Sequence, residues 1–136
     1  MTSYLHLHAG HYDLLIDIAR VREVLVLDDA TVVGNGDSHR AWRDEILPVR
    51  DLTATLGGPP RRRPAAVVLD DGLGGHVFLE VDGIGRVMAM EDRQFQPLPP
   101  LTGPAEAAFD GFTMAGGLGR GMLRLRLDAV LAEARP

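Results

Sequence analysis

The sequence predicts an all-β fold, and three observations support that prediction. Apolar residues alternate with polar ones at period two along most of the chain, which is typical of strands with one buried face. Clusters of glycine, proline and aspartate interrupt this alternation at spacings of roughly 8–12 residues, as they do in sandwiches and barrels. Strands and helices do not alternate in the βαβ manner, so a Rossmann-like fold is disfavoured.

The chain begins with a predicted hairpin. An alternating first strand leads to Gly10 and His11, which form a turn, and residues 12–18 return as an apolar strand. The apolar spacing in residues 20–27 then predicts a short helical turn that leads into a third strand.

The middle of the chain predicts a strand, a helical turn and a connection. Pro48 lies inside the apolar stretch 46–49, and it favours an edge or a bulge because proline cannot donate a ladder hydrogen bond. Asp51 is placed to cap a short helical turn that ends at two glycines. The segment 57–64, GGPPRRRP, is expected to be an exposed connection.

The remaining strands follow the same alternation and bring the total to about nine. Asp128 is placed to cap a terminal helix that runs to about Glu133. The glycine-rich segments 33–38 and 116–121 predict loops. The expected strands are 4–8, 12–18, one within 20–27, 46–49, 65–69, 77–81, 84–90, 109–114 and 122–127.

The composition excludes several kinds of site and partner. The 136 residues include no cysteine, which rules out disulfides, thiolate zinc sites and a cysteine nucleophile. The formal charge is −5 and no basic face is evident, so we expect no nucleic-acid partner. The N-terminus does not resemble a signal peptide, and no apolar stretch approaches the ~18 residues that span a bilayer, so we expect no membrane insertion.

Three histidines near the N-terminus are the candidate metal ligands. His6 and His8 share one face of the first strand and His11 lies across the turn, so the three imidazoles could converge. We favour the plainer interpretation that they occupy a wet strand face, because no carboxylate is placed to orient the rings. No serine–histidine pair forms a recognisable nucleophile elbow, so we expect neither an enzyme nor a cofactor.

One segment resembles a known family. Residues 42–52, WRDEILPVRDL, are similar to the CheW-family segment LRGxVVPVxDL, and Asp44 stands where the family has a glycine that would take a positive φ. Residues 18–25 are similar to the family's IxxVxEVI, and 77–87 resemble its VGLLVDEVLEV. Six such matches follow the family order over nearly the whole chain; the others include Pro97-Leu98-Pro99, Phe109-Asp110-Gly111 and Leu125 to Leu131.

The resemblance implies a fold and an organisation. CheW-like proteins consist of two small SH3-like five-stranded barrels packed together, here with short helical turns and a C-terminal helix. We therefore expect residues 1–136 to form one CheW-like domain of two intertwined subdomains. The expected subdomains are 1–20 plus 85–136, and 21–84.

The resemblance also implies a function. CheW-like proteins are cytoplasmic, non-catalytic adaptors without a cofactor that couple a CheA-type histidine kinase to the cytoplasmic tips of methyl-accepting chemoreceptors. By this likeness the partner contacts fall on Val21, Val24, Arg43 and Val49. The alternatives are that the valines belong to the core and that Arg43 forms a structural ion pair with a nearby aspartate.

Two other functions remain open from the residues alone. The chain could be a self-associating module that pairs through exposed strand edges. It could also be a small metal-dependent hydrolase that uses His6, His8 and His11.

Overall fold

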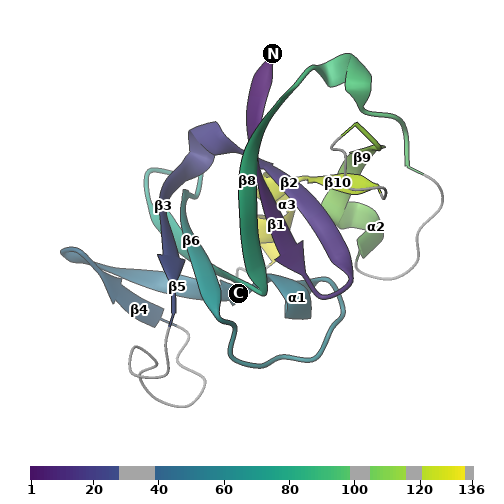
Figure 1. Cartoon of the computed structure of the whole chain (residues 1–136). Helices are drawn as coiled ribbons and strands as arrows, with labels where there is room; N and C mark the ends of the chain where they lie inside the picture. Colours follow the sequence, from purple (N-terminus) through teal and green to yellow (C-terminus); the bar gives the residue numbers. More distant parts are fainter. Residues whose placement is uncertain (28–38, 99–104, 116–120, 134–136) are drawn as a thin grey trace.

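A computed structural model describes residues 1–27, 39–98, 105–115 and 121–133. The loop expected at 33–38 and most of the loop expected at 116–121 lie outside these ranges. The described strands form two five-stranded sheets, which lie against each other (Figure 1).

The first sheet has the strand order β8-β1-β2-β10-β9. The predicted hairpin is confirmed as β1 (Thr2–Ala9) and β2 (Tyr12–Asp17). β8 (Gly83–Met90) pairs antiparallel with β1, whereas β10 (Met122–Leu125) pairs parallel with β2 and antiparallel with β9 (Phe109–Thr113). This sheet therefore takes its strands from two separated parts of the chain.

The second sheet has the order β3-β6-β7-β5-β4. Its strands are β3 (Val21–Val26), β4 (His39–Trp42), β5 (Glu45–Asp51), β6 (Ala65–Asp70) and β7 (His76–Val81). The mainly-β class and the two five-stranded units are thus confirmed. Neither unit is a closed barrel in its described hydrogen bonding, because β8 and β9 are the edges of the first sheet and β3 and β4 are the edges of the second.

Pro48, which was expected at an edge or a bulge, lies within β5 at a change of strand partner. β5 pairs with β4 from Glu45 to Pro48 and then with β7 from Val49 to Asp51. Pro48 therefore stands where one ladder ends and the next begins. A residue without a backbone N–H can be accommodated at such a change of partner.

Short helices connect the strands. The predicted cap at Asp51 is confirmed, since its carboxylate accepts a hydrogen bond from the amide of Ala54 at 3.1 Å. Asp128 lies in the first turn of the last helix rather than capping it, because that helix begins one residue earlier. None of the described helices is long and apolar enough to cross a membrane. The helices are η1 (Ile18–Arg20), α1 (Leu52–Thr55), η3 (Asp92–Gln94), α2 (Ala105–Ala108) and α3 (Leu127–Glu133).

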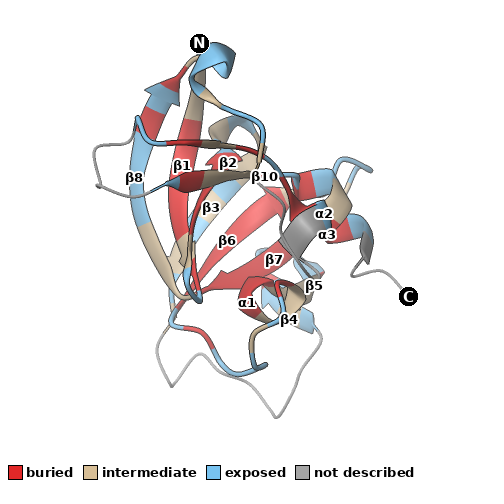
Figure 2. Cartoon of the chain, turned by 90° about the vertical axis from the view of Figure 1, so that its right-hand side faces the viewer, coloured by how far each residue is buried: buried red, intermediate tan, exposed pale blue. Residues whose placement is uncertain are grey.

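Both faces of the central strands are buried, which Figure 2 shows as red along β6 and β7. In β6, Val67 and Leu69 join the large core between the two sheets, whereas Val68 joins a separate core with Trp42 and Phe78 on the other face of the second sheet. A strand that is buried on both faces has a continuous run of apolar residues in its sequence, and residues 65–69 are such a run. The first sheet likewise has an outer core, formed by Tyr4, Leu15, Met88, Met90 and Met122.

A buried arginine joins the connection 57–64 to both sheets. The side chain of Arg63 is only 1% exposed, and it donates hydrogen bonds of 3.0 Å to Asp51 and to Asp82. Asp82 also accepts hydrogen bonds from Thr53 and from the amide of Gly10 in the β1–β2 turn. The expectation that this whole segment is exposed is therefore wrong at Arg63, because two carboxylates from elsewhere in the chain compensate the buried charge.

Candidate interaction groove

A groove lies between the two edge strands of the second sheet. It has a volume of about 490 Å³, and Phe78 of β7 contributes to its lining. We call it the β3–β4 groove. Its remaining lining residues are Glu23, Leu25, Val26 and Leu27 on the β3 side and His39, Arg40, Ala41, Trp42 and Arg43 on the β4 side.

Side chains bridge this groove, whereas no backbone ladder joins its two sides within the described ranges. The indole Nε1 of Trp42 donates a hydrogen bond of 2.8 Å to Glu23 Oε2. The guanidinium of Arg43 lies 4.6 Å from the centre of the Trp42 ring and approaches the Glu23 carboxylate at 4.0 Å. An indole, a carboxylate and a guanidinium therefore join the two edge strands at one end of the groove.

Arg43 adopts the positive φ that the family resemblance led us to expect at its neighbour Asp44. Its φ is 53°, and Asp44 is not among the positive-φ residues of the described chain. A positive φ costs a residue with a β-carbon about 1–2 kcal/mol. The tight turn between Trp42 and Glu45, which are paired across β4 and β5, imposes this conformation.

Exposed apolar side chains in and beside the groove extend its surface. β3 alternates between half-buried and exposed residues, so Val24 (43% exposed) and Val26 (87% exposed) face solvent. Ile46 of β5, which is paired with Ala41 of β4, is 69% exposed. Among the described residues β3 is an edge strand. Exposed apolar residues on an edge strand, beside an apolar groove with aromatic and arginine residues, are typical of a protein-binding surface.

The four predicted contact residues fall into two pairs. Val24 and Arg43 are exposed and lie on or beside the groove. Val21 is half-buried against the core between the sheets, and Val49 is half-buried against the core beneath the groove. Sequence reasoning missed Trp42 and Glu23, although Trp42 is the only tryptophan and directly precedes the family-like Arg43.

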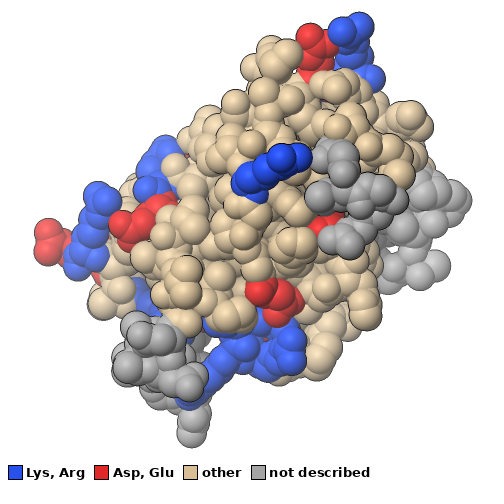
Figure 3. Space-filling view, in the orientation of Figure 1, with Lys and Arg blue, Asp and Glu red and all other residues tan. Residues whose placement is uncertain are grey.

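Charges on the face shown in Figure 3 are scattered and of both signs. Around the groove, Arg40 lies 3.8 Å from Glu80 and stacks 5.4 Å above the ring of Phe78. This face therefore offers no continuous basic surface of the kind that tracks a nucleic-acid backbone.

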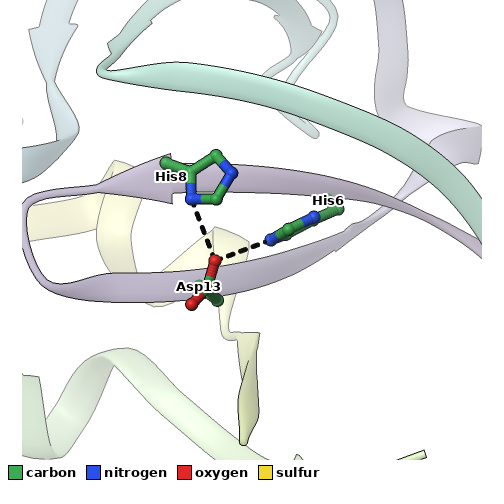
Figure 4. A group of neighbouring side chains, drawn as sticks. All are labelled: His6, His8 and Asp13. Carbon is green, nitrogen blue, oxygen red and sulfur yellow. Dashed lines mark hydrogen bonds and ion pairs between the residues drawn. The ribbon is translucent and has the colours of Figure 1, made fainter. Parts of the chain in front are cut away.

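The three predicted imidazoles do not converge; an aspartate takes the place of one of them. His6 Nε2 and His8 Nδ1 each lie 2.9 Å from Asp13 Oδ1 (Figure 4). His11 is exposed in the turn. The expectation of a wet face is wrong for His6, which is buried on the side of the sheet that carries Tyr4 and Leu15, whereas His8 and His11 are accessible to solvent. The expectation that no carboxylate orients the rings is wrong as well, because Asp13 does so. The pairing of His8 with Asp13 across a two-residue turn was the signal in the sequence.

Comparisons with known proteins give a family and a fold. A family model described as the CheW-like domain matches residues 3–135. The crystal structure of the scaffolding protein TtCheW from Thermoanaerobacter tengcongensis matches with a TM-score of 0.75 at 20% identity, covering 95% of this chain and 91% of that chain. No curated protein matches the chain.

Proposed function

The chain belongs to the CheW-like domain family, and from that premise we propose that it is a non-catalytic adaptor that couples a CheA-type histidine kinase to chemoreceptors. The work of such an adaptor is to hold proteins together in the cytoplasm, so its chemistry is that of contact surfaces. The observation that favours this role is the β3–β4 groove, which combines an apolar lining with two strand edges that have no further partner among the described residues.

We assign the kinase to this groove. The outer edge of β3, which pairs with no other strand in the part of the chain that the structure describes, can accept a partner strand, and the outward valines Val24 and Val26 supply apolar contact there. Arg43, held over the Trp42 ring, supplies a rigid cationic anchor at the rim. Val21 and Val49 contribute indirectly, through packing. The half-buried side chain of Val21 supports β3 against the core between the sheets, and that of Val49 supports the floor of the groove.

The test measures binding of the purified chain to the regulatory domain of each CheA-type kinase of the same host. We expect Val24→Arg and Arg43→Glu to weaken binding by at least about tenfold, as hot-spot substitutions do. Leu73→Arg is the matched control, because Leu73 is an exposed apolar residue of the turn before β7 and does not line the groove. Binding to none of these kinases, or equal losses in Leu73→Arg, would reject the assignment.

Self-association through β3 is the alternative that the same unpaired edge allows. Light scattering on the separated chain distinguishes the two functions. A monomer that binds kinase supports the adaptor, whereas a dimer that Val24→Arg dissociates supports self-association. The hydrolase alternative required His11 beside His6 and His8, and the structure places His11 outside that group.

A further inference from the structure

His6, His8 and Asp13 form a group of potential metal ligands that the adaptor function does not use. One donor atom from each residue lies within 4.8 Å of the other two. All three residues belong to the β1–β2 hairpin, which fixes their positions: His8 is directly opposite Asp13, and His6 lies two residues further along the same strand face. Donors held on paired strands are better preorganised than donors on loops.

The burial of the group leaves one side open. The side chains of His6 and Asp13 are each only 6% exposed, whereas that of His8 is 40% exposed. An ion could therefore enter past His8 and bind against two ligands that are already shielded from water. In Figure 4 both rings point across the hairpin toward the same carboxylate oxygen.

Two glycines of β8 make room for the imidazoles. A β-carbon on Gly85 would lie 2.6 Å from His6 Nδ1, and one on Gly83 would lie 3.2 Å from His8 Cδ2. The register between β1 and β8 also shifts beside His6, between the Leu5–Val87 and Leu7–Ile84 pairs, as at a β-bulge. Small residues and a local bulge at this point allow both rings to pack side by side beneath β8.

The donor set matches the chemistry of a divalent transition metal. Two imidazole nitrogens and one carboxylate oxygen suit Zn²⁺ and its neighbours, whereas Mg²⁺ and Ca²⁺ prefer oxygen ligands alone. Ligands at about 2.0–2.2 Å from one zinc ion lie roughly 3 to 3.5 Å from each other. The two nitrogen–oxygen separations of 2.9 Å are close to that value, and the two imidazole nitrogens lie within 4.8 Å of each other.

We propose that His6, His8 and Asp13 bind one divalent transition-metal ion, with zinc as the probe. Three protein ligands leave a fourth position, on the side where His8 is exposed, for water or for a ligand from a partner protein. The bound ion ties β1 to β2 at the end of the hairpin that also carries Gly10, a hydrogen-bond donor to Asp82. The site is independent of the β3–β4 groove.

The test is calorimetric titration of the full chain, without a histidine tag, with ZnCl₂. We expect one ion per chain with a dissociation constant of about 1 µM or tighter, and we expect MgCl₂ not to compete. His8→Ala and His8→Gln are each expected to weaken binding at least about tenfold, because His8 is the ligand whose loss disturbs the core least. His11→Ala is the matched control and is expected to bind zinc as the unmodified chain does.

A second measurement follows the thermal midpoint, which zinc raises when it binds the folded chain alone. This rise should disappear in both His8 variants and persist in His11→Ala. Binding weaker than about 100 µM would show that the three residues form a hydrogen-bonded group only and would overturn the proposal. Unchanged binding in the two His8 variants, or loss in His11→Ala, would overturn it equally.

Discussion

Trp42 donates a hydrogen bond to Glu23 across the two edge strands of the second sheet, at 2.8 Å. The two residues are 19 positions apart, and no backbone ladder joins β3 to β4 in the described chain. The hydrogen bond therefore connects the two sides of the β3–β4 groove. It also places the only tryptophan of the chain where a bound partner would alter its surroundings.

Glu23→Ala should loosen this connection. The substitution leaves a half-buried indole N–H without its acceptor, so we expect a loss of about 1 kcal/mol in the free energy of unfolding. We also expect a red shift of the Trp42 fluorescence in the folded state. Glu23→Gln is the matched control, because its amide oxygen can still accept the hydrogen bond; equal effects of the two variants would contradict this role of the acceptor.

Arg63→Ala should be far more destabilising than the same change at its neighbour Arg61. Removing Arg63 leaves the carboxylates of Asp51 and Asp82 without their buried partner, and such losses cost about 3–5 kcal/mol. The side chain of Arg61 is largely exposed and approaches Asp82 no closer than 3.7 Å. We therefore expect Arg61→Ala to lower the free energy of unfolding by less than about 1 kcal/mol. Urea unfolding curves of the two variants provide the comparison, and similar midpoints would refute the buried role of Arg63.

The stability of the chain should fall on the acid side through Asp82. Burial alone would raise the pKa of Asp82, but hydrogen bonds from Thr53 and the Gly10 amide, with the charge of Arg63, bring that pKa below its ordinary value of 3.8. The unfolded chain then binds a proton at higher pH than the folded chain does. The stability that the Asp82 carboxylate contributes is therefore fully present once the pH is about one unit above 3.8. This stability is lost as the pH falls through the lower pKa of the folded state.

Urea midpoints measured from about pH 5 downward test this dependence. We expect the midpoint to fall steeply in the unmodified chain and less steeply in Asp82→Asn. Arg63→Ala removes one of the causes that lower the pKa, so its slope should be intermediate. The prediction fails when Asp82→Asn keeps the slope of the unmodified chain.

Arg43→Gly should be more stable than Arg43→Ala. Both variants lose the contact with the Trp42 ring, but only glycine adopts a φ of 53° without strain. We expect a difference of about 1 kcal/mol between them, measured by urea unfolding. Asp44→Gly is the control, because the family has a glycine at this position but Asp44 has no positive φ. We expect no gain in stability from Asp44→Gly.

The fold was predictable from the sequence where local pattern alone determines structure. The alternation around Gly10 predicted the β1–β2 hairpin, and Asp51 with the glycines after Leu56 predicted the capped helical turn. These features depend on residues close together in the chain, for which periodicity and capping rules suffice.

Other positions depended on partners that are distant in the sequence. His6 has the period of a solvent-facing residue, but its ring is buried against Gly85 of the neighbouring strand β8, which begins more than seventy residues later. Arg63 lies in a run of three arginines between prolines, yet it is buried because Asp51 and Asp82 meet it from two other elements. The β3–β4 groove requires knowledge of strand order, which no local pattern provides.

The strand order also determines when each sheet can be completed during synthesis. The described strands of the second sheet all lie between Val21 and Val81, whereas the first sheet needs β10, which inserts between β2 and β9. Because translation proceeds from the N-terminus, β1, β2 and β8 are made and can pair before β10 exists, as can the strands of the second sheet. A nascent chain halted before Met122 would therefore carry a β8-β1-β2 sheet whose β2 edge still lacks β10, and an open strand edge of this kind is a site for pairing with other chains.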